Sequence, residues 1–299
     1  MKRIPMLVGL VILCMALSAG PLYAVCSITR GKVEVSQGTG AACTSIQTAV
    51  NLANGTTPLL VSVLPGTYTE NITMISNITL AGSGRDVTFI QPLSSSSAVV
   101  TISSLENVVV EGFTINGGSS QNGVQISSSS PTIKNNRFVG SNINAIHNTS
   151  ASPIIAGNLF KDTGGTAILS EIGSAALVQD NKITNCGRSI RDWNSSSTLT
   201  GNVFEGNGDF IEIQRSSTKI INNIIKDQWA GIYVSQLASD GGRPIIRDNI
   251  ITGSTGNSDI NVYNGANPNI SNNIYDTFTG SGAVGAYNVK QDGTPAPLQ

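Results

Sequence analysis

The sequence predicts an all-β fold, a right-handed parallel β-helix (a solenoid) of roughly ten coils with a short N-terminal capping helix. Three observations predict this fold: a repeated apolar-x-x-Asn-x-apolar unit, a second apolar position in each repeat, and turn-forming residues between the apolar runs. The unit is clear at Ile133, Asn136 and Phe138. Its asparagines recur 21 to 26 residues apart and are predicted to form a structural ladder: Asn136, Asn158, Asn181, Asn202, Asn223, Asn249 and Asn273.

Stacking explains why such a repeat folds. A short strand cannot bury its apolar face alone, but coils stacked about 4.8 Å apart pair all their strands and bring equal positions into columns. The ladder asparagine suits a tight turn because Asn tolerates a left-handed backbone, and its amide can bond along the stack. The second apolar column is predicted to consist of Ile146, Ile168, Ile190, Ile211, Ile232, Ile260 and Val284.

Residues 1–24 are predicted to be a secretory signal peptide. Lys2 and Arg3 precede an apolar run, residues 6–19, and residues 22–24 form a small-residue exit. The run is shorter than the roughly 20 residues that a spanning helix needs, which disfavours a membrane anchor. We therefore expect a secreted or periplasmic protein with no membrane span in the mature chain.

Residues 25–58 are predicted to be an N-terminal arm that ends in the capping helix. The segment 44–47 fits a capping box, and helical spacing of the apolar residues follows it. This helix would cover the first coil, whose strand edge would otherwise template aggregation. Export permits disulfides, so a bridge between Cys26 and Cys43 is plausible, with Cys186 left as a packed thiol.

The β-helix itself is predicted over residues 59–285, followed by a C-terminal tail, residues 286–299. No helix comparable to the N-terminal one closes the C-terminal end. Two alternatives therefore stay open: the tail folds over the last coil, or it leaves that coil to a partner, which would allow an oligomer through the C-terminal coil.

The composition excludes several classes of protein. Lys+Arg 17 and Asp+Glu 18 give a net charge of −1, and charged residues make up 12% of the chain. A nucleic-acid-binding protein needs a basic face, so we expect no nucleic-acid partner. One histidine and no zinc-like cysteine spacing predict no metal site.

The chain resembles the pectin lyase-like superfamily over about residues 44–285. Four segments of this sequence carry the resemblance and look like the opening of pectin methylesterases: residues 45–50, 65–70, 78–82 and 84–90. Similar openings occur in uncharacterised β-helix repeat families. The resemblance implies the fold, but a shared fold does not fix an activity.

The catalytic motifs of the superfamily are not matched. Residues 179–182, 208–212 and 242–245 resemble three methylesterase motifs, but Asp180 occupies the turn position of the repeat, and the Thr-Leu and Phe-Gly parts are missing. The His-Gly of polygalacturonases and the Asp-Pro-His of mannuronan epimerases are absent, and residues 243–247 have the wrong spacing for the pectate lyase motif. The resemblance therefore implies no specific reaction.

Alternation along the strands predicts which side chains face outward beside the second apolar column. The first outward column is His147, Leu169, Arg191, Glu212, Tyr233 and Asn261, and the second is Thr149, Glu171, Trp193, Gln214, Ser235 and Tyr263. If this is the strand that bears active sites in the superfamily, six of these residues form a ligand-binding groove: Arg191, Trp193, Glu212, Gln214, Tyr233 and Tyr263. Aromatic rings would stack on sugars while charges bind hydroxyls or uronates. The plain alternative is a solvated surface with an Arg191–Glu212 ion pair worth under about 1 kcal/mol.

Two functions are compatible with the sequence. The first is an exported, non-catalytic β-helix that binds polysaccharide or another cell-envelope component, or acts as an extracellular scaffold, without a cofactor. The alternative is a lyase or hydrolase acting on an extended, uronate-type glycan. A lyase would use a basic residue, for which Arg191 is the candidate. Calcium would be a cofactor only in the case of a lyase. A hydrolase would use two carboxylates, for which Glu171 and Glu212 are the candidates.

An apolar outward stripe, residues 203, 224, 250 and 274, is predicted in the C-terminal half, one position after the ladder asparagine. Such a stripe is explained either by β-propensity on an exposed sheet or by a covering segment or partner.

Overall fold

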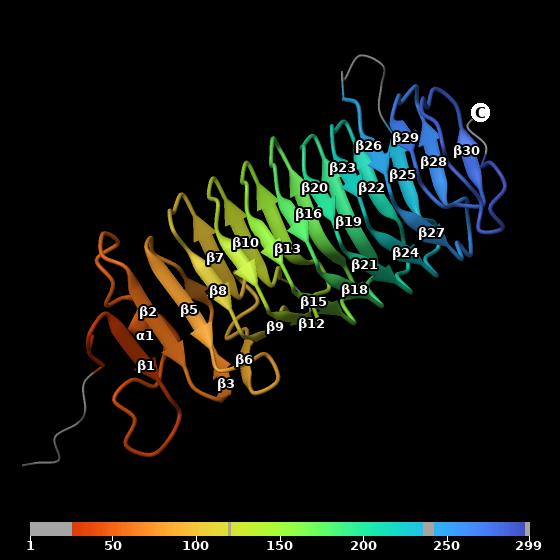
Figure 1. Ribbon diagram of the computed structural model, residues 1–299. Helices are drawn as coiled ribbons and strands as arrows, with labels where there is room; N and C mark the ends of the chain where they lie inside the picture. The colour runs from red at the N-terminus through yellow and green to blue at the C-terminus, as the bar shows by residue number, and fades with distance from the viewer. Residues whose placement is uncertain (1–25, 119–120, 236–241, 297–299) are drawn as a thin grey trace, which may run out of the picture.

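A computed structural model describes residues 26–118, 121–235 and 242–296, and it shows a parallel β-helix whose coils stack along one axis (Figure 1). Three parallel sheets run along the solenoid, and strands of successive coils are neighbours in each. The predicted all-β solenoid of about ten coils is therefore confirmed. The predicted signal peptide lies outside the described residues.

The three sheets are named A, B and C. Sheet A contains β1 (Lys32–Val35), β2 (Leu59–Val63), β5 (Ile78–Gly82), β8 (Val109–Glu111), β11 (Thr132–Lys134), β14 (Ile154–Ala156), β17 (Leu177–Gln179), β20 (Thr198–Thr200), β23 (Lys219–Ile221), β26 (Ile245–Arg247) and β29 (Asn269–Ser271). Sheet B contains β3 (Gly66–Thr69), β6 (Thr88–Gln91), β9 (Thr114–Asn116), β12 (Arg137–Val139), β15 (Leu159–Lys161), β18 (Lys182–Thr184), β21 (Val203–Glu205), β24 (Ile224–Lys226) and β27 (Ile250–Thr252). Sheet C contains β4 (Ile72–Thr73), β7 (Val100–Ser103), β10 (Val124–Ser127), β13 (Asn144–Thr149), β16 (Thr166–Glu171), β19 (Arg188–Trp193), β22 (Ile211–Gln214), β25 (Ile232–Ser235), β28 (Ile260–Tyr263) and β30 (Phe278–Gly280).

The core is a set of apolar columns that the repeat places inside the solenoid. Ile133 pairs with Ile155, which pairs with Val178, and all three are buried. Phe138 and Phe160 stack in the adjacent column with ring centroids 4.8 Å apart. Burying one such side chain contributes about 1.5–3 kcal/mol, so each coil stabilises its neighbours mainly through these layers.

The ladder asparagines are buried and connect each coil to the next from Asn136 to Asn273. Asn158, for example, accepts from the backbone N–H of Asn136 (2.9 Å) and donates to the carbonyl of Ile133 (2.9 Å). The expectation of a left-handed backbone at these residues is wrong. Positive φ instead falls on the residue before each, such as Asn135 (56°), because the ladder side chain must point inward from an ordinary backbone.

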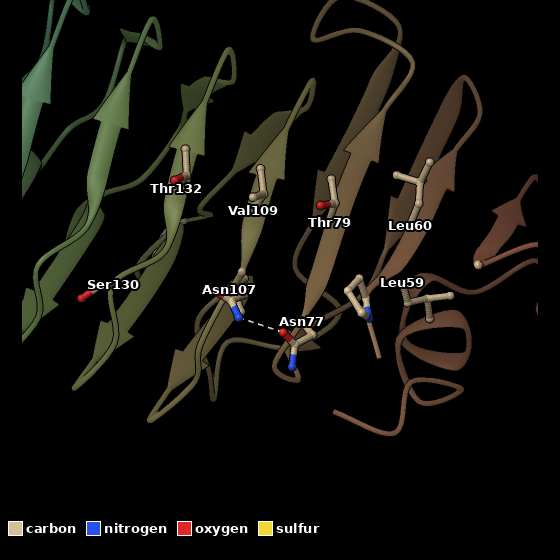
Figure 2. Close-up of a pocket in the computed structure, with 11 residues that line it drawn as sticks. Leu59, Leu60, Asn77, Thr79, Asn107, Val109, Ser130 and Thr132 are labelled. Carbon is tan, nitrogen blue, oxygen red and sulfur yellow. Dashed lines mark hydrogen bonds between the residues drawn. The ribbon is translucent and has the colours of Figure 1, made fainter. Parts of the chain in front are cut away.

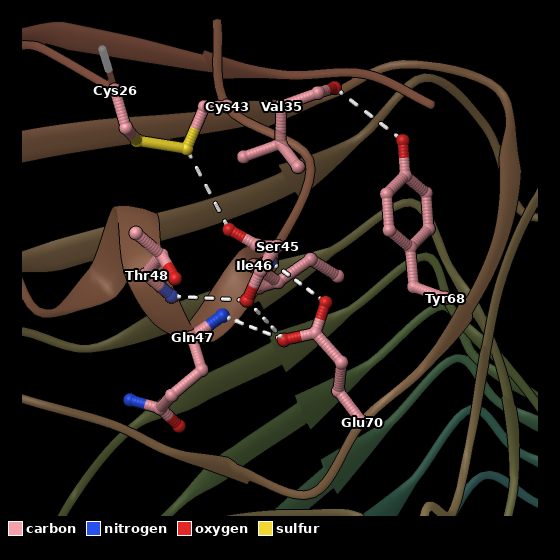
Figure 3. Close-up of a disulfide and its surroundings, with 9 residues drawn as sticks. All are labelled: Cys26, Val35, Cys43, Ser45, Ile46, Gln47, Thr48, Tyr68 and Glu70. Carbon is pink, nitrogen blue, oxygen red and sulfur yellow. Dashed lines mark hydrogen bonds between the residues drawn. A yellow bond between two sulfur atoms is a disulfide. The ribbon is translucent and has the colours of Figure 1, made fainter. Parts of the chain in front are cut away.

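The parallel ladder starts earlier than residue 59. β1 pairs in register with β2, so part of the predicted arm is the first strand of sheet A. The predicted disulfide between Cys26 and Cys43, which links two parts of this arm, is confirmed (S–S 1.98 Å; Figure 3).

The capping helix α1 (Ile46–Val50) is present, but its cap differs from the predicted one. The N-cap is Ser45, whose hydroxyl accepts from the N–H of Thr48 (3.2 Å), and not Thr44. The carboxylate of Glu70 accepts from the next two helix N–H groups, at 2.8 Å each (Figure 3). Gln47 is thereby free to bond the backbone of Thr73 through both amide atoms, which occupies the open edge of β4.

The C-terminal residues fold over the last coil. Ile270 donates to the carbonyl of Val284 (2.8 Å), and Asn273 donates to the side chain of Asn288 (3.1 Å), which adds an unpredicted rung to the ladder. The prediction that Val284 belongs to the second apolar column is wrong. Phe278 pairs with Ile260 there instead, because the last coil is shorter than the repeat. Among the described residues, no helix has the length and apolarity to cross a bilayer.

Candidate functional site

The two predicted outward columns lie in register on sheet C, on strands that are adjacent in Figure 1. Leu169 pairs with Arg191, and Arg191 pairs with Glu212. In the second column, Glu171 pairs with Trp193 and Trp193 with Gln214. The repeat thus brings the candidate residues of β16, β19 and β22 to one face.

A charged cluster occupies the centre of this face. Arg188, which the sequence reasoning missed, donates two hydrogen bonds to the carboxylate of Asp209 (2.9 and 2.6 Å). Oε2 of Glu212 lies 3.0 Å from Arg188 and 3.3 Å from Nε of Arg191. Neither of the latter contacts has hydrogen-bond geometry, so their attraction is coulombic. Since the side chain of Glu212 is only 10% exposed, this carboxylate is occupied by its two cations.

Aromatic side chains form a row along the solenoid axis beside this cluster. Tyr233 stacks on Phe210 (centroids 4.8 Å apart) and on Tyr263 (5.3 Å), which come from the preceding and the following coil. Both faces of the Tyr233 ring are therefore covered by protein. Its predicted use as a stacking platform for a sugar is not available in this geometry, because a sugar ring must lie on an open aromatic face.

Among the aromatic residues of the two predicted columns, Trp193 is the most exposed. Its side chain is 39% exposed, and the guanidinium of Arg191 lies 5.4 Å from the ring centroid. A cavity of about 340 Å³ adjoins this indole and is lined by Glu171, Ile172, Trp193, Asn194 and Arg215. This volume is at the lower end of the range for small-ligand sites, about 300–1,000 Å³.

Ile172 is the unusual member of this cavity. It has a φ of 55° and is 57% exposed. A left-handed backbone is a genuine outlier for a β-branched residue, and strain of this kind gathers at functional sites. The same corner position in six other coils holds Ser104, Ser128, Ser150, Asn194, Arg215 and Asn264. Aligning this corner in the sequence would have revealed the isoleucine.

His147 holds the carboxylate on the cavity wall. Its Nε2 lies 3.1 Å from Oε2 of Glu171, and Nδ1 lies 3.5 Å from the amide nitrogen of Asn122. Glu171 is therefore bound to a different partner from Glu212. The structure does not bring these two carboxylates together, because β19 with Arg191 and Trp193 lies between their strands.

A buried acid lies behind the site, on the inner side of β19. Asp192 is fully buried and accepts hydrogen bonds from Ser195, Ser197 and Thr218. Burial raises the pKa of the Asp192 carboxyl, and these hydrogen bonds partly oppose that rise. Asp192 joins β19 to the corner that follows it and so fixes the strand that carries Trp193.

A larger cavity, of about 710 Å³, lies on sheet A near the N-terminal end. Figure 2 shows Leu60, Thr79, Val109 and Thr132 in a row on successive strands, with Asn107 and Asn77 at one side. None of its lining residues is charged or aromatic. The smaller cavity at Trp193 therefore offers more groups that can bind a ligand, because a carboxylate, an amide, a guanidinium and an indole line it. Within the described parts of the chain, no three His, Cys, Asp or Glu side chains gather to hold a metal ion.

A family model described as "Right handed beta helix region" matches residues 66–209 and 122–275. The chain belongs to this right-handed β-helix family. No curated protein matches the sequence.

Two of the solved structures that resemble this right-handed β-helix protein are a mannuronan C-5 epimerase module and an exopolygalacturonase. The A-module of mannuronan C-5 epimerase AlgE4 from Azotobacter vinelandii is 15% identical, with 85% of this chain and 92% of the module covered and a TM-score of 0.50. The family 28 exopolygalacturonase from Yersinia enterocolitica is 10% identical, with 85% and 75% covered and a TM-score of 0.51. At these identities the likeness shows the fold alone, and the predicted pectin lyase-like fold is confirmed.

Proposed function

We propose that this protein is an exported, non-catalytic β-helix that binds a polysaccharide through the cavity at Trp193. The observation that carries the proposal is the strained and exposed Ile172 beside an exposed indole and a carboxylate, in one cavity. An indole with adjacent carboxylate, amide and guanidinium groups suits a sugar, whose apolar face stacks while its hydroxyls bond to polar groups. Recognition then centres on one sugar unit, with the chain continuing over sheet C.

The charges of the site favour a neutral or weakly charged glycan. Asp209 and Glu212 are compensated by Arg188 and Arg191. In the cavity lining the carboxylate of Glu171 is matched by the guanidinium of Arg215, so the cavity has no excess of positive charge to attract a uronate. This supports a partner in the cell envelope or extracellular matrix that offers hydroxyl donors.

Export is part of the same proposal. The Cys26–Cys43 disulfide supports a location outside the cytosol, because disulfides persist in oxidising compartments. Secretion or a periplasmic location both agree with this.

The partners of Glu171 and Glu212 support a binding role over hydrolysis. A hydrolase needs one carboxyl group free to protonate the leaving group and a second free to act as base or nucleophile. Here the Glu171 carboxylate contacts His147, and the Glu212 carboxylate lies between two guanidinium groups. The lyase or hydrolase alternative, with calcium only in the case of a lyase, is tested in the same experiment.

Affinity electrophoresis through gels that contain a panel of neutral and acidic polysaccharides, with and without calcium, tests the proposal. We expect retardation by one glycan, and Trp193→Ala should weaken it at least about tenfold, which is about 1.4 kcal/mol. Trp229→Ala is the matched control, since Trp229 is 44% exposed but does not line the cavity.

Equal loss in both variants, or no retardation by any glycan, would refute the binding site. Shortening of the retained glycan, abolished by Glu171→Gln or Arg191→Ala, would replace the binding role with an enzymatic one. Unchanged glycan length supports the non-catalytic proposal.

A further inference from the structure

The polar residues around His147 determine which of its two ring nitrogens carries the hydrogen. This residue is the one histidine of the chain, and it lies on β13 in the outward column that continues to Leu169 on β16. In a neutral imidazole one ring nitrogen donates and the other accepts, and the partners of the ring decide which is which. The tautomer of His147 therefore follows from the side chains that face each nitrogen.

Asn122, just before β10, supplies a hydrogen-bond donor to Nδ1. Its amide oxygen accepts from the side-chain amide of Asn144 (2.9 Å), so the nitrogen is the atom that faces His147. One hydrogen of this nitrogen bonds to the amide oxygen of Gln125 (2.8 Å), and the other faces Nδ1 of His147 (3.5 Å). Turning the Asn122 amide over would place its nitrogen against the amide nitrogen of Asn144 and lose both bonds. Nδ1 is therefore the acceptor of the ring.

Nε2 of the same ring faces an acceptor. Oε2 of Glu171 lies 3.1 Å away, and a carboxylate accepts hydrogen bonds but does not donate them. The hydroxyl of Thr149, 3.4 Å from Nε2, can donate or accept and so does not decide the tautomer. A neutral His147 with its hydrogen on Nε2 satisfies both sides. An imidazolium would instead turn a second N–H toward the amide hydrogens of Asn122.

The bond from His147 leaves the second carboxylate oxygen of Glu171 to the cavity. Among the described residues, no hydrogen bond reaches Oε1 of Glu171, and this residue lines the cavity together with Trp193. The two residues are register partners on adjacent strands, β16 and β19, about 4.8 Å apart. A sugar that stacks on the indole therefore has its edge beside Oε1, which is an acceptor held in place from behind by His147.

We propose that His147, fixed by Asn122, is a positioning residue that makes the cavity selective for glycans with a free hydroxyl group at this edge of the sugar. This inference rests on the proposed function. A hydroxyl donates to Oε1 of Glu171, and a hydrogen bond to a carboxylate is about twice as strong as one between neutral groups. An O-acetylated sugar has no hydrogen to donate there and leaves the carboxylate facing another acceptor, which such a site rejects. The ligand class is therefore a glycan that is not substituted at this hydroxyl.

The tautomer can be observed directly, because the whole protein contributes one imidazole to a spectrum. With isotope-labelled histidine, a long-range proton–nitrogen correlation spectrum at neutral pH should show a protonated Nε2 and an unprotonated Nδ1. Asn122→Asp replaces the donor at Nδ1 by a carboxylate oxygen, so Nδ1 should become protonated. Asn142→Asp is the matched control, because it adds the same charge at an exposed position just before β13 and should leave the spectrum unchanged.

Affinity electrophoresis of the whole protein in gels that contain glucomannan, mixed-linkage β-glucan or dextran, each native and O-acetylated, tests the selectivity. O-acetylation should weaken the retention by at least about tenfold, and so should His147→Leu on the native glycan, because it releases Glu171. Leucine already stands in this column at Leu169, so the fold should accept it. His147→Gln keeps an N–H near the place of Nε2 and should restore retention to within about threefold of wild type.

The outcomes separate this inference from the proposed function. A protonated Nδ1 in wild type, or an Asn122→Asp spectrum equal to that of wild type, would overturn the network. Equal retention of native and acetylated glycan, or of wild type and His147→Leu, would overturn the selectivity and leave the binding site at Trp193 in place. Retention by His147→Gln as weak as that by His147→Leu would also overturn it. If no glycan retards the wild type, the proposed function fails and the selectivity fails with it.

Discussion

Removing one rung of the asparagine ladder should destabilise the protein far more than changing its neighbour. Asn223 is 1% exposed. It accepts from the backbone N–H of Asn202 (2.9 Å) and donates to the carbonyl of Leu199 (2.9 Å). In Asn223→Ala, these two buried backbone groups lose their partners, at about 1–3 kcal/mol each. The expected loss is therefore about 2–6 kcal/mol, a large part of the 5–15 kcal/mol that typically stabilises a domain.

Equilibrium unfolding in urea, followed by circular dichroism, measures this loss. Hydrogen exchange at the Asn202 amide provides a local readout, because that N–H should lose protection. Asn222→Gly is the control: Asn222 has a φ of 56°, and glycine holds the same position at Gly201. A loss below about 1 kcal/mol for Asn223→Ala, or an equal loss in both variants, would refute the view that the buried amide ladder holds the coils together.

Three further predictions concern the corner, the arm and the buried acid. Ile172→Asn should stabilise the fold by about 1 kcal/mol in thermal melts by relieving the left-handed strain, yet weaken glycan retention; a less stable variant would contradict this. Replacing Cys26 and Cys43 by serine should lower the free energy of unfolding, measured in urea, by about 3 kcal/mol. An unchanged unfolding midpoint would show that the disulfide does not stabilise the fold. Because burial raises the pKa of the Asp192 carboxyl, protonation of this group favours the folded state. The resulting contribution to stability is complete below the pKa of Asp192 in the unfolded chain and is lost as the pH rises through its pKa in the folded chain. The stability of wild type relative to Asp192→Asn should therefore increase as the pH is lowered through the raised pKa of this carboxyl toward the ordinary pKa of an aspartate, and a constant difference would show that Asp192 does not titrate there.

The inward positions of the fold were predictable because every coil repeats the same requirement. Ile155 and Val178 had to be buried in one column, since a change of register would expose both. The prediction failed where the repeat ends: Val284 has the right residue type, but no full coil precedes it, so Phe278 takes the position. The left-handed residue was misplaced by one position because the sequence shows a recurring Asn without showing which backbone it has.

The site was predictable only to the level of columns. Pairing of Arg191 with Glu212 follows from the register, whereas the direction in which long side chains lean does not. Arg188 contacts Glu212 although it lies three positions before Arg191 in β19. Tyr233 is covered by Phe210, a residue outside both columns. Such contacts depend on rotamers and on the corner before each strand, which repeat less strictly than the core.

The ladder also separates the frame of the molecule from its corners. The step from Asn202 to Asn223 is 21 residues and that from Asn223 to Asn249 is 26, yet both rungs bond at the same 2.9 Å. The extra residues lie between β25 and β26, at the corner between sheets C and A that in earlier coils bears Ile172 and Asn194. Chain length at this corner can therefore vary without shifting any buried layer. New binding loops could be inserted at this corner in one coil at a time, because the scaffold already accommodates one longer connection there.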